Sequence, residues 1–167
     1  MANIFTNKNV NDTYFNMSNG LTSVFIHTLC ISGLYNVNES FKKDILIWFA
    51  QRDWIILGIG FEGFDISEII WDKSIFDMQK EFILETIDAV FKEKNWNLLN
   101  YTPNKEWLFI RLELFKQMIY DYKCDNINEG AQFAIFDFDE KVIKYEQCEK
   151  HRIYKHYKGC VVCNNSQ

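Results

Sequence analysis

The feature that most constrains this chain is a cluster of cysteine and histidine residues in the segment CEKHRIYKHYKGCVVC, residues 148–163. Cys148 and His151 are two potential ligands separated by two residues, and Cys160 and Cys163 form a second such pair. Two pairs of this kind supply the four donors of a tetrahedral zinc site, because one tight turn can direct two ligands to the same ion. The spacing therefore predicts that these four residues bind Zn²⁺.

Other interpretations of the cluster are a disulfide, a reduced cluster without a ligand, and a redox Cys-x-x-Cys motif. A disulfide fits poorly with an odd number of cysteines, five, and with the absence of a recognisable export signal. A redox motif normally follows a strand in a βαβ unit, and no such pattern occurs here. His156 is an alternative fourth ligand, although the two-residue spacing favours His151.

The expected donor set also bears on whether the metal takes part in chemistry. Three cysteines and one histidine complete a tetrahedron, whereas a catalytic zinc keeps one position open for water. A deaminase-type site would need a glutamate two residues after its histidine, and Ile153 occupies that position. We therefore expect a structural zinc and no enzymatic activity.

Three further patterns that can indicate catalysis are better explained by structure. The segment 54–63 contains G-x-G-x-x-G, but no βαβ alternation follows it. Asp137 and Asp139 follow an apolar run, as in phosphatase-like hydrolases, without the large α/β domain that such enzymes need. His27 and Cys30 lie on an apolar helix without a third, orienting group. We interpret these features as a connector, a hairpin turn and core residues, respectively.

Apolar residues at helical spacing predict helices at the start of the chain. One helix is expected from about residue 21 to residue 35, capped by Ser18 or Asn19, and a second is expected to begin at Ser40. Residues 1–20 are predicted to form an irregular arm.

Two later helices have clearer boundaries. Ser74 and Asp77 have the spacing of a capping box, and an apolar stripe follows them to about residue 94. Thr102 as cap and Pro103 at the first helical position predict the start of the next helix.

After residue 126 the pattern changes to alternation with period two. The runs QFAIFDF and KVIKYEQ, separated by a short turn, predict a β-hairpin over residues 132–147. The sequence thus predicts an α+β fold. We expect a mainly helical body in residues 1–130, and a β-hairpin with a zinc-ribbon-like module in residues 131–167 packed on it.

Charge is unevenly distributed along the chain. The net charge is −5 overall, with +3 in residues 140–167 and −8 in residues 1–139. An acidic body is a poor nucleic-acid binder, because contacts to phosphate dominate that affinity, but it suits a basic protein partner. On the third predicted helix, acidic residues at spacings of four, four and three form one stripe: Asp77, Glu81, Glu85 and Asp88. The stripe is either a solvated face or the binding surface for a basic protein.

The C-terminal segment itself carries an interleaved basic and aromatic set: Lys150, Arg152, Tyr154, Lys155, Tyr157 and Lys158. Aromatic rings that stack on bases and lysines that contact phosphates are typical of nucleic-acid-binding modules. The same residues are also ordinary surface on a small hairpin. A zinc-ribbon nucleic-acid-binding or transcription accessory protein is therefore the alternative function.

The central region 63–119 contains DIS-x-x-x-W, F-x-x-x-x-ID and W-x-x-L-x-Y-x-P-N-x-E-W. In these features it resembles small bacterial immunity proteins of secreted polymorphic toxin systems. The tail CEKHRIYKHYKGCVVCNN is similar to zinc-ribbon tails of bacterial accessory proteins. The resemblance implies a non-catalytic protein that binds and neutralises one cognate toxin domain, such as a basic nuclease. It assigns no individual contact residue.

No apolar run is long enough to cross a bilayer, since the longest one, residues 21–35, is short and interrupted by polar residues. The polar N-terminal stretch also lacks a secretory signal pattern. We expect a cytoplasmic protein without membrane contacts.

Overall fold

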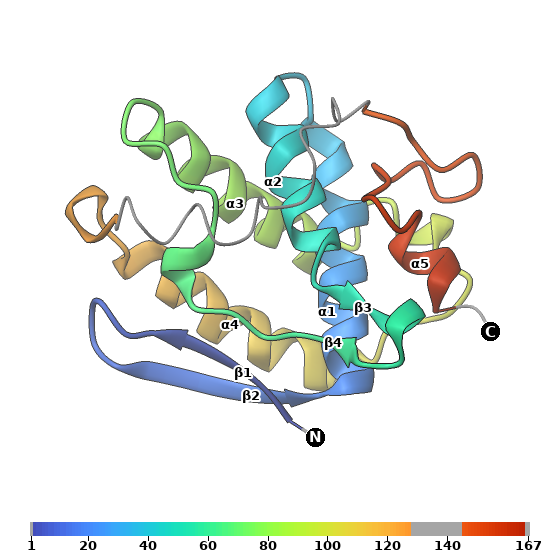
Figure 1. Cartoon of the computed structure of the whole chain (residues 1–167), viewed down its shortest axis with the longest axis horizontal. Helices are drawn as coiled ribbons and strands as arrows, with labels where there is room; N and C mark the ends of the chain where they lie inside the picture. Colours follow the sequence, from blue (N-terminus) through green and yellow to red (C-terminus); the bar gives the residue numbers. More distant parts are fainter. Residues whose placement is uncertain (1, 128–144, 166–167) are drawn as a thin grey trace.

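The computed structural model describes residues 2–127 and 145–165, and within these ranges the chain combines helices with two small antiparallel sheets (Figure 1). The α-helices are α1 (Asn19–Ser32), α2 (Ser40–Ala50), α3 (Phe76–Phe91), α4 (Lys105–Asp121) and the short α5 (Val161–Asn164). The strands are β1 (Ala2–Asn7), β2 (Thr13–Ser18), β3 (Asp53–Trp54) and β4 (Gly60–Phe61). The 3-10 turns are η1 (Gly33–Asn36), η2 (Ile55–Leu57), η3 (Ile66–Glu68), η4 (Trp96–Leu98) and η5 (Cys124–Asn126). The predicted mixture of helix and sheet is confirmed, whereas the hairpin predicted for residues 132–147 falls almost wholly outside the described residues.

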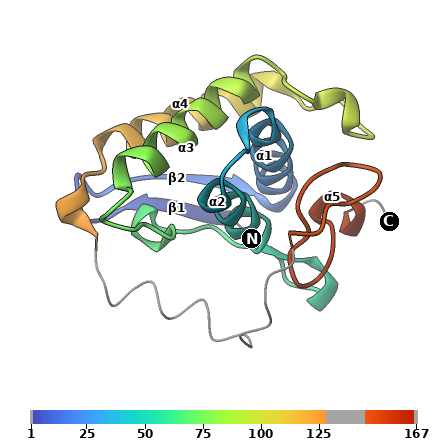
Figure 2. The same ribbon diagram turned by 90° about the horizontal axis from the view of Figure 1, so that it is seen from above.

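The central element is α1, against which α2, α3 and α4 pack. Figures 1 and 2 show α3 and α4 on one side of α1, and the C-terminal segment with α5 on the other. An aromatic cluster fills the interior, with ring centroids of neighbouring members 4.9–6.4 Å apart: Phe5, Phe15, Phe25, Trp48, Phe49, Phe64 and Phe115. Large apolar rings of this kind supply much of the buried surface that stabilises a domain. Among the described helices, none has the length and apolar character needed to cross a membrane.

The N-terminal residues form a β-hairpin, so the prediction of an irregular arm is wrong. β1 and β2 pair antiparallel with Phe5 opposite Phe15, and the two rings stack with their centroids 4.9 Å apart. Asn3 and Asn7 share the buried face of β1 with Phe5, which hides the alternation of apolar and polar residues expected of a half-buried strand. The amide of Asn3 donates to two side-chain oxygens of α1, and that of Asn7 donates to a backbone carbonyl of α4. These hydrogen bonds offset the cost of burying polar side chains.

The first two helices begin close to where the sequence predicts. Ser18 caps α1, since its hydroxyl accepts a hydrogen bond from the backbone N–H of Leu21 at 3.3 Å. Ser40 is the first residue of α2. The long first helix that we predicted continues past Ser32 as the 3-10 turn η1 rather than as α-helix.

The predicted capping box at the start of α3 is wrong. The helix begins at Phe76, and no side chain caps it. The hydroxyl and backbone N–H of Ser74 instead both donate to Asp72, at 2.6 and 2.8 Å. Ser74 therefore stabilises the turn that precedes the helix, and Asp77 is free to face outward.

The start of α4 also differs from the prediction. Asn104, rather than Thr102, is the cap, and its Oδ1 accepts from the backbone N–H of Trp107 at 3.4 Å. Pro103 precedes this cap instead of occupying the first helical position. The helix starts two residues later than expected because asparagine is at least as good a cap as threonine.

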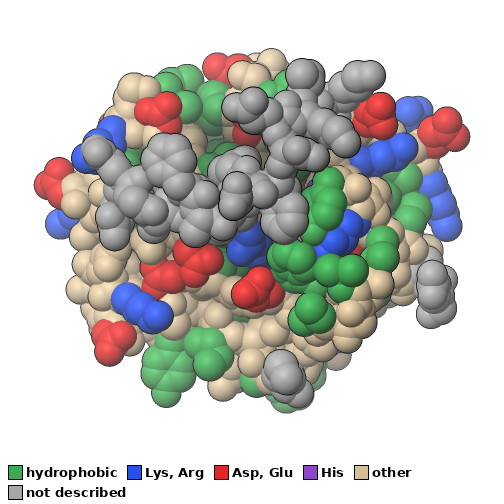
Figure 3. Space-filling view, in the orientation of Figure 1, with side chains coloured by type: hydrophobic (Ala, Val, Ile, Leu, Met, Phe, Trp, Pro, Cys, Tyr) green, Lys and Arg blue, Asp and Glu red, His purple; other side chains and the backbone are tan. Residues whose placement is uncertain are grey.

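The segment 54–63 forms a connector, as predicted, and not a phosphate-binding loop. It contains η2 and β4, and no helix begins at its last glycine. Three aliphatic side chains of this connector are exposed: Ile56, Leu57 and Ile59. Figure 3 shows hydrophobic side chains gathered where Figure 1 draws β3 and β4. The connector therefore presents an apolar surface.

Gly63 lies against the backbone of β1. A Cβ added to it would lie 2.1 Å from the carbonyl oxygen of Ile4 and 2.8 Å from its nitrogen. Because backbone atoms cannot move aside cheaply, we expect Gly63→Ala to destabilise the protein by about 3 kcal/mol in urea unfolding. Gly20→Ala is the control, since an added Cβ there meets nothing within 4 Å. Equal stability of the two variants would contradict this close approach.

Candidate metal centre

The structure brings the four predicted ligands together. Their donor atoms (three cysteine Sγ atoms and a His151 ring nitrogen) all lie within 4.8 Å of one another. The Sγ atoms of Cys148 and Cys163 are 3.7 Å apart, and Nδ1 of His151 lies 3.3, 3.5 and 3.8 Å from the Sγ atoms of Cys163, Cys160 and Cys148. Metal–ligand distances of about 2.3 Å for sulfur and 2.0–2.1 Å for nitrogen place the corners of a tetrahedron roughly 3.8 Å (S–S) and 3.6 Å (S–N) apart. The cluster therefore has the dimensions of a tetrahedral metal site.

The first ligand pair lies on a tight turn. The backbone N–H of Arg152 donates to the carbonyl of Cys148 at 2.8 Å, and the N–H of Cys148 donates to the carbonyl of Ile153 at 2.9 Å. Arg152 has a φ of +61°, in the left-handed region that glycine adopts most easily. This backbone geometry directs Cys148 and His151 toward the same point.

The second pair lies at the start of α5. Cys160 is the N-cap of this short helix, and its Sγ accepts from the backbone N–H of Cys163 at 3.5 Å. A left-handed conformation is possible in principle for Asn164 and Asn165, but Asn164 is helical and Asn165 has a φ of −96°. The two ligand pairs thus come from different local structures, a turn and a helix start.

The protonation of the ligands suits a bound cation. Burial lowers the pKa of His151, so its imidazole is neutral and has a lone pair to donate. Burial raises the pKa of Cys160 to about 12 and also raises that of Cys163, while backbone N–H groups outweigh burial and lower the pKa of Cys148. A metal ion reverses the cost of burying thiolates, because its charge deprotonates a coordinating thiol.

Nothing in the donor set indicates catalysis. Four protein ligands fill a tetrahedron and leave no position for water or substrate. The alternative ligand His156 lies outside the group of four, and its Nε2 faces Asp53 Oδ2 at 3.7 Å. The centre can hold a metal ion, and its chemistry is that of a structural staple.

Asp53 joins the metal-binding segment to the body of the protein. This buried carboxylate accepts hydrogen bonds from Asn164 Nδ2 and from the backbone N–H of Ile55, both at 3.0 Å. Burial opposes its ionisation, but these bonds and the neighbouring His156 outweigh burial and lower its pKa. Sequence reasoning missed Asp53, although an acidic residue inside a largely apolar stretch was a usable signal.

His27 is a second anchor for this segment. Its Nδ1 lies 2.8 Å from the hydroxyl of Tyr101, and its Nε2 lies 3.2 Å from Nδ2 of Asn165. Cys30 donates instead to the carbonyl of Leu46, so the two residues form no catalytic dyad. The interpretation of His27 and Cys30 as core residues fits these contacts, but the link from His27 to the C-terminal segment was not foreseen.

Burial of His27 should make the stability of the protein depend on pH. It lowers the pKa of this imidazole from 6.5 to about 4, so the unfolded chain binds the proton more readily. Stability should therefore be complete above pH 6.5 and fall between pH 6.5 and 4, by on the order of 3 kcal/mol from this residue. Urea unfolding of His27→Gln should show a shallower fall. Acid releases the metal ligands equally in both proteins, so identical slopes would rule out this role.

The structure places the predicted acidic stripe on one side of α3. Asp77, Glu81 and Glu85 are exposed, while Asp88 is half-buried. Asp88 pairs with Lys116 of α4 at 2.6 Å, and Glu85 accepts a hydrogen bond from Asn36 at 2.8 Å. The N-terminal part of the stripe is thus the part most available to a partner.

The basic and aromatic residues of the C-terminal segment are partly used within the fold. Tyr154 is buried, and Nζ of Lys158 lies 3.6 Å from the ring centroid of Trp54. Fewer groups of this set therefore remain for phosphates or bases than the sequence suggests. Asp137 and Asp139 lie outside the described residues.

Comparisons of this chain with protein-family models, with curated proteins and with solved structures found no match.

Proposed function

We propose that this protein is a non-enzymatic immunity protein that binds and neutralises one cognate bacterial toxin, and that a structural Zn²⁺ holds its C-terminal segment in place. Zinc fits the donor set best, because soft thiolates and an imidazole in tetrahedral array are its preferred surroundings. The 3.3–3.8 Å separations reported above among these donors support one ion shared by all four residues.

The observation that carries the binding function is the exposed acidic side of α3. Asp77, Glu81 and Glu85 are solvent-exposed acids spaced four residues apart on one helix. Like charges at this spacing repel one another by a few tenths of a kcal/mol per pair. A basic partner surface removes that repulsion on binding and gains attraction, which favours rapid association. A nuclease toxin, cationic because it must contact phosphate, has the complementary charge.

Expression of the neighbouring gene tests this proposal. The open reading frame immediately upstream is expressed in a bacterial host, alone and together with this chain. We expect growth arrest in the first case, recovery in the second, and a stable complex of the two purified proteins in gel filtration. A partner gene that causes arrest without any rescue or complex contradicts the proposal. Steeply salt-dependent binding of DNA or RNA by this chain would favour the alternative function.

A further inference from the structure

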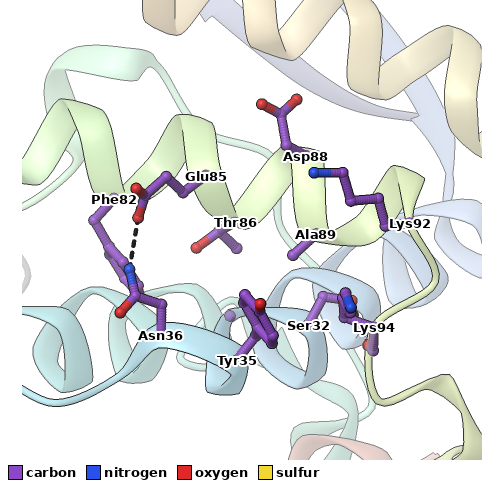
Figure 4. A pocket seen from close by; sticks show the side chains of 11 residues that line it. Ser32, Tyr35, Asn36, Phe82, Glu85, Thr86, Asp88, Ala89, Lys92 and Lys94 are labelled. Carbon is purple, nitrogen blue, oxygen red and sulfur yellow. Dashed lines mark hydrogen bonds between the residues drawn. The ribbon is translucent and has the colours of Figure 1, made fainter.

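A pocket of about 300 Å³ lies between α3 and the end of α1 with η1, on the opposite side of α1 from the metal centre (Figure 4). The residues that line it and take part in the argument are Tyr35, Asn36, Glu85, Thr86, Lys92 and Lys94. A cavity of this size is at the lower end of the range of small-molecule sites. Its lining combines one aromatic ring, one buried hydroxyl and side chains of both charges.

Thr86 indicates that the pocket is built to hold a polar ligand. Its side chain is only 2% exposed, and among the described residues its Oγ1 has no hydrogen-bond partner. A threonine inside a helix usually bonds to the carbonyl four residues earlier, and a buried hydroxyl without a partner is costly. Figure 4 shows Thr86 directed toward the space between α3 and η1. A ligand with a hydrogen-bonding group at that point would satisfy it.

The charged residues of the pocket are separated by sign. Glu85 stands at one end, where Asn36 donates to its Oε2 at 2.8 Å. Lys92 and Lys94 stand at the other end, and Figure 4 shows Thr86 between the two groups. Glu85 and Lys92 are seven residues apart, which corresponds to about 10 Å along a helix axis. Asp88 contributes little to this separation, because Lys116 already pairs with it at 2.6 Å.

We propose that this pocket binds a small zwitterion with an ammonium group and a carboxylate group, namely a free amino acid or a short peptide. Glu85 accepts hydrogen bonds from the ammonium group, and Lys92 with Lys94 bind the carboxylate. Thr86 bonds to the middle of the ligand, and the ring of Tyr35 forms a side wall. Nζ of Lys94 lies 4.8 Å from the centroid of that ring, which holds this cation at the edge of the pocket. The site does not depend on the toxin partner or on the metal.

Titration of the full, metal-loaded chain with small probes tests the proposal by NMR. Glycylglycine should shift the backbone amide signals of Glu85, Thr86 and Lys92 in a saturable way, with a Kd on the order of 1 mM, as expected for so small a ligand. Propylamine and propionate, which carry one charge each, should bind at least roughly tenfold more weakly. Glycine and triglycine complete the series, and tighter binding of glycine would identify a free amino acid rather than a peptide.

Three substitutions identify the contacts. Glu85→Gln and Lys92→Met should each weaken glycylglycine binding roughly tenfold, and Thr86→Val roughly fivefold, since charged hydrogen bonds are the stronger ones. Glu81→Gln is the matched control, because it makes the same change one turn earlier on α3, outside the pocket lining. Its affinity should be unchanged.

The same measurements can overturn the proposal. Saturable binding of propylamine or propionate as tight as that of glycylglycine would exclude a zwitterion site, as would the absence of any saturable shift at 20 mM, roughly twenty times the expected Kd. Unchanged affinity in all three pocket variants would place the ligand elsewhere. Thr86→Val is nearly isosteric and removes an unpartnered hydroxyl, so it should fold at least as stably as the parent. Its thermal midpoint provides the folding check.

Discussion

Removal of the metal from the purified protein should unfold the C-terminal segment 145–165 and leave α1 to α4 folded. The segment contains only one short helix, and the ligand cluster joins its two halves. In small zinc modules the apparent free energy of metal binding is roughly 10–16 kcal/mol, and it is also the free energy of folding. The four longer helices have their own aromatic core and do not need the metal to stay packed.

Metal analysis and NMR check this expectation. Protein purified under reducing conditions should contain about one equivalent of zinc. A strong chelator should collapse the amide signals of 145–165 toward random-coil positions while the helical circular dichroism changes little. Cys160→Ser should behave like the chelated protein, and Cys124→Ser, a partly buried cysteine outside the cluster, should keep its zinc. Protein that contains no zinc when chelators are avoided would refute the metal centre.

Reversal of charge at Asp77 and Glu81 should abolish protection by this protein against its toxin. Both side chains are exposed, so Asp77→Lys with Glu81→Lys should leave the fold intact. The change turns two attractive charges into repulsive ones toward a basic surface. Association should slow by roughly tenfold or more at low salt, and less at high salt, where charges are screened. Glu85 is left unchanged, because it also bonds to Asn36 and lines the pocket.

The matched control is Glu106→Lys with Glu113→Lys on α4. These residues are also exposed acids on one helix, and the substitution changes the net charge by the same amount. Only reversal on α3 should impair growth rescue and slow association measured by surface plasmon resonance. If the α3 variant protects as well as the parent protein, the interface lies on another surface.

The helices and the ligand cluster were predictable because their signals are local. An apolar stripe at helical spacing or a pair of ligands two residues apart is complete within a few turns of chain. The N-terminal hairpin was missed because Asn3 and Asn7 are buried through hydrogen bonds to helices α1 and α4. No nearby residue in the sequence reveals those partners. The helix caps at Ser74 and Thr102 failed for a related reason, since several suitable polar residues compete at each start.

The metal site shows the same limit. Its four ligands lie within sixteen residues of sequence, and their spacing alone was sufficient to group them. Asp53 and His27, which anchor the site to the body, are separated from their C-terminal partners by 111 and 138 positions, respectively. Their role follows only from the tertiary fold. The exposed helix face at Asp77 and Glu81 lies between these cases, because its geometry follows from the sequence but its partner does not.

The distance along the chain between His27 and Asn165 has a consequence for folding kinetics. Closing a loop of 138 residues costs much more entropy than forming the neighbouring contacts among α1, α2 and β3. Contacts of high sequence separation form late, so the body should assemble first and present Asp53 and His27 as a ready landing surface. Until the segment docks, the apolar groups that cover Val161 and Val162 are exposed to water. In a cell short of zinc, newly made chains would therefore remain in this sticky intermediate and be prone to self-association.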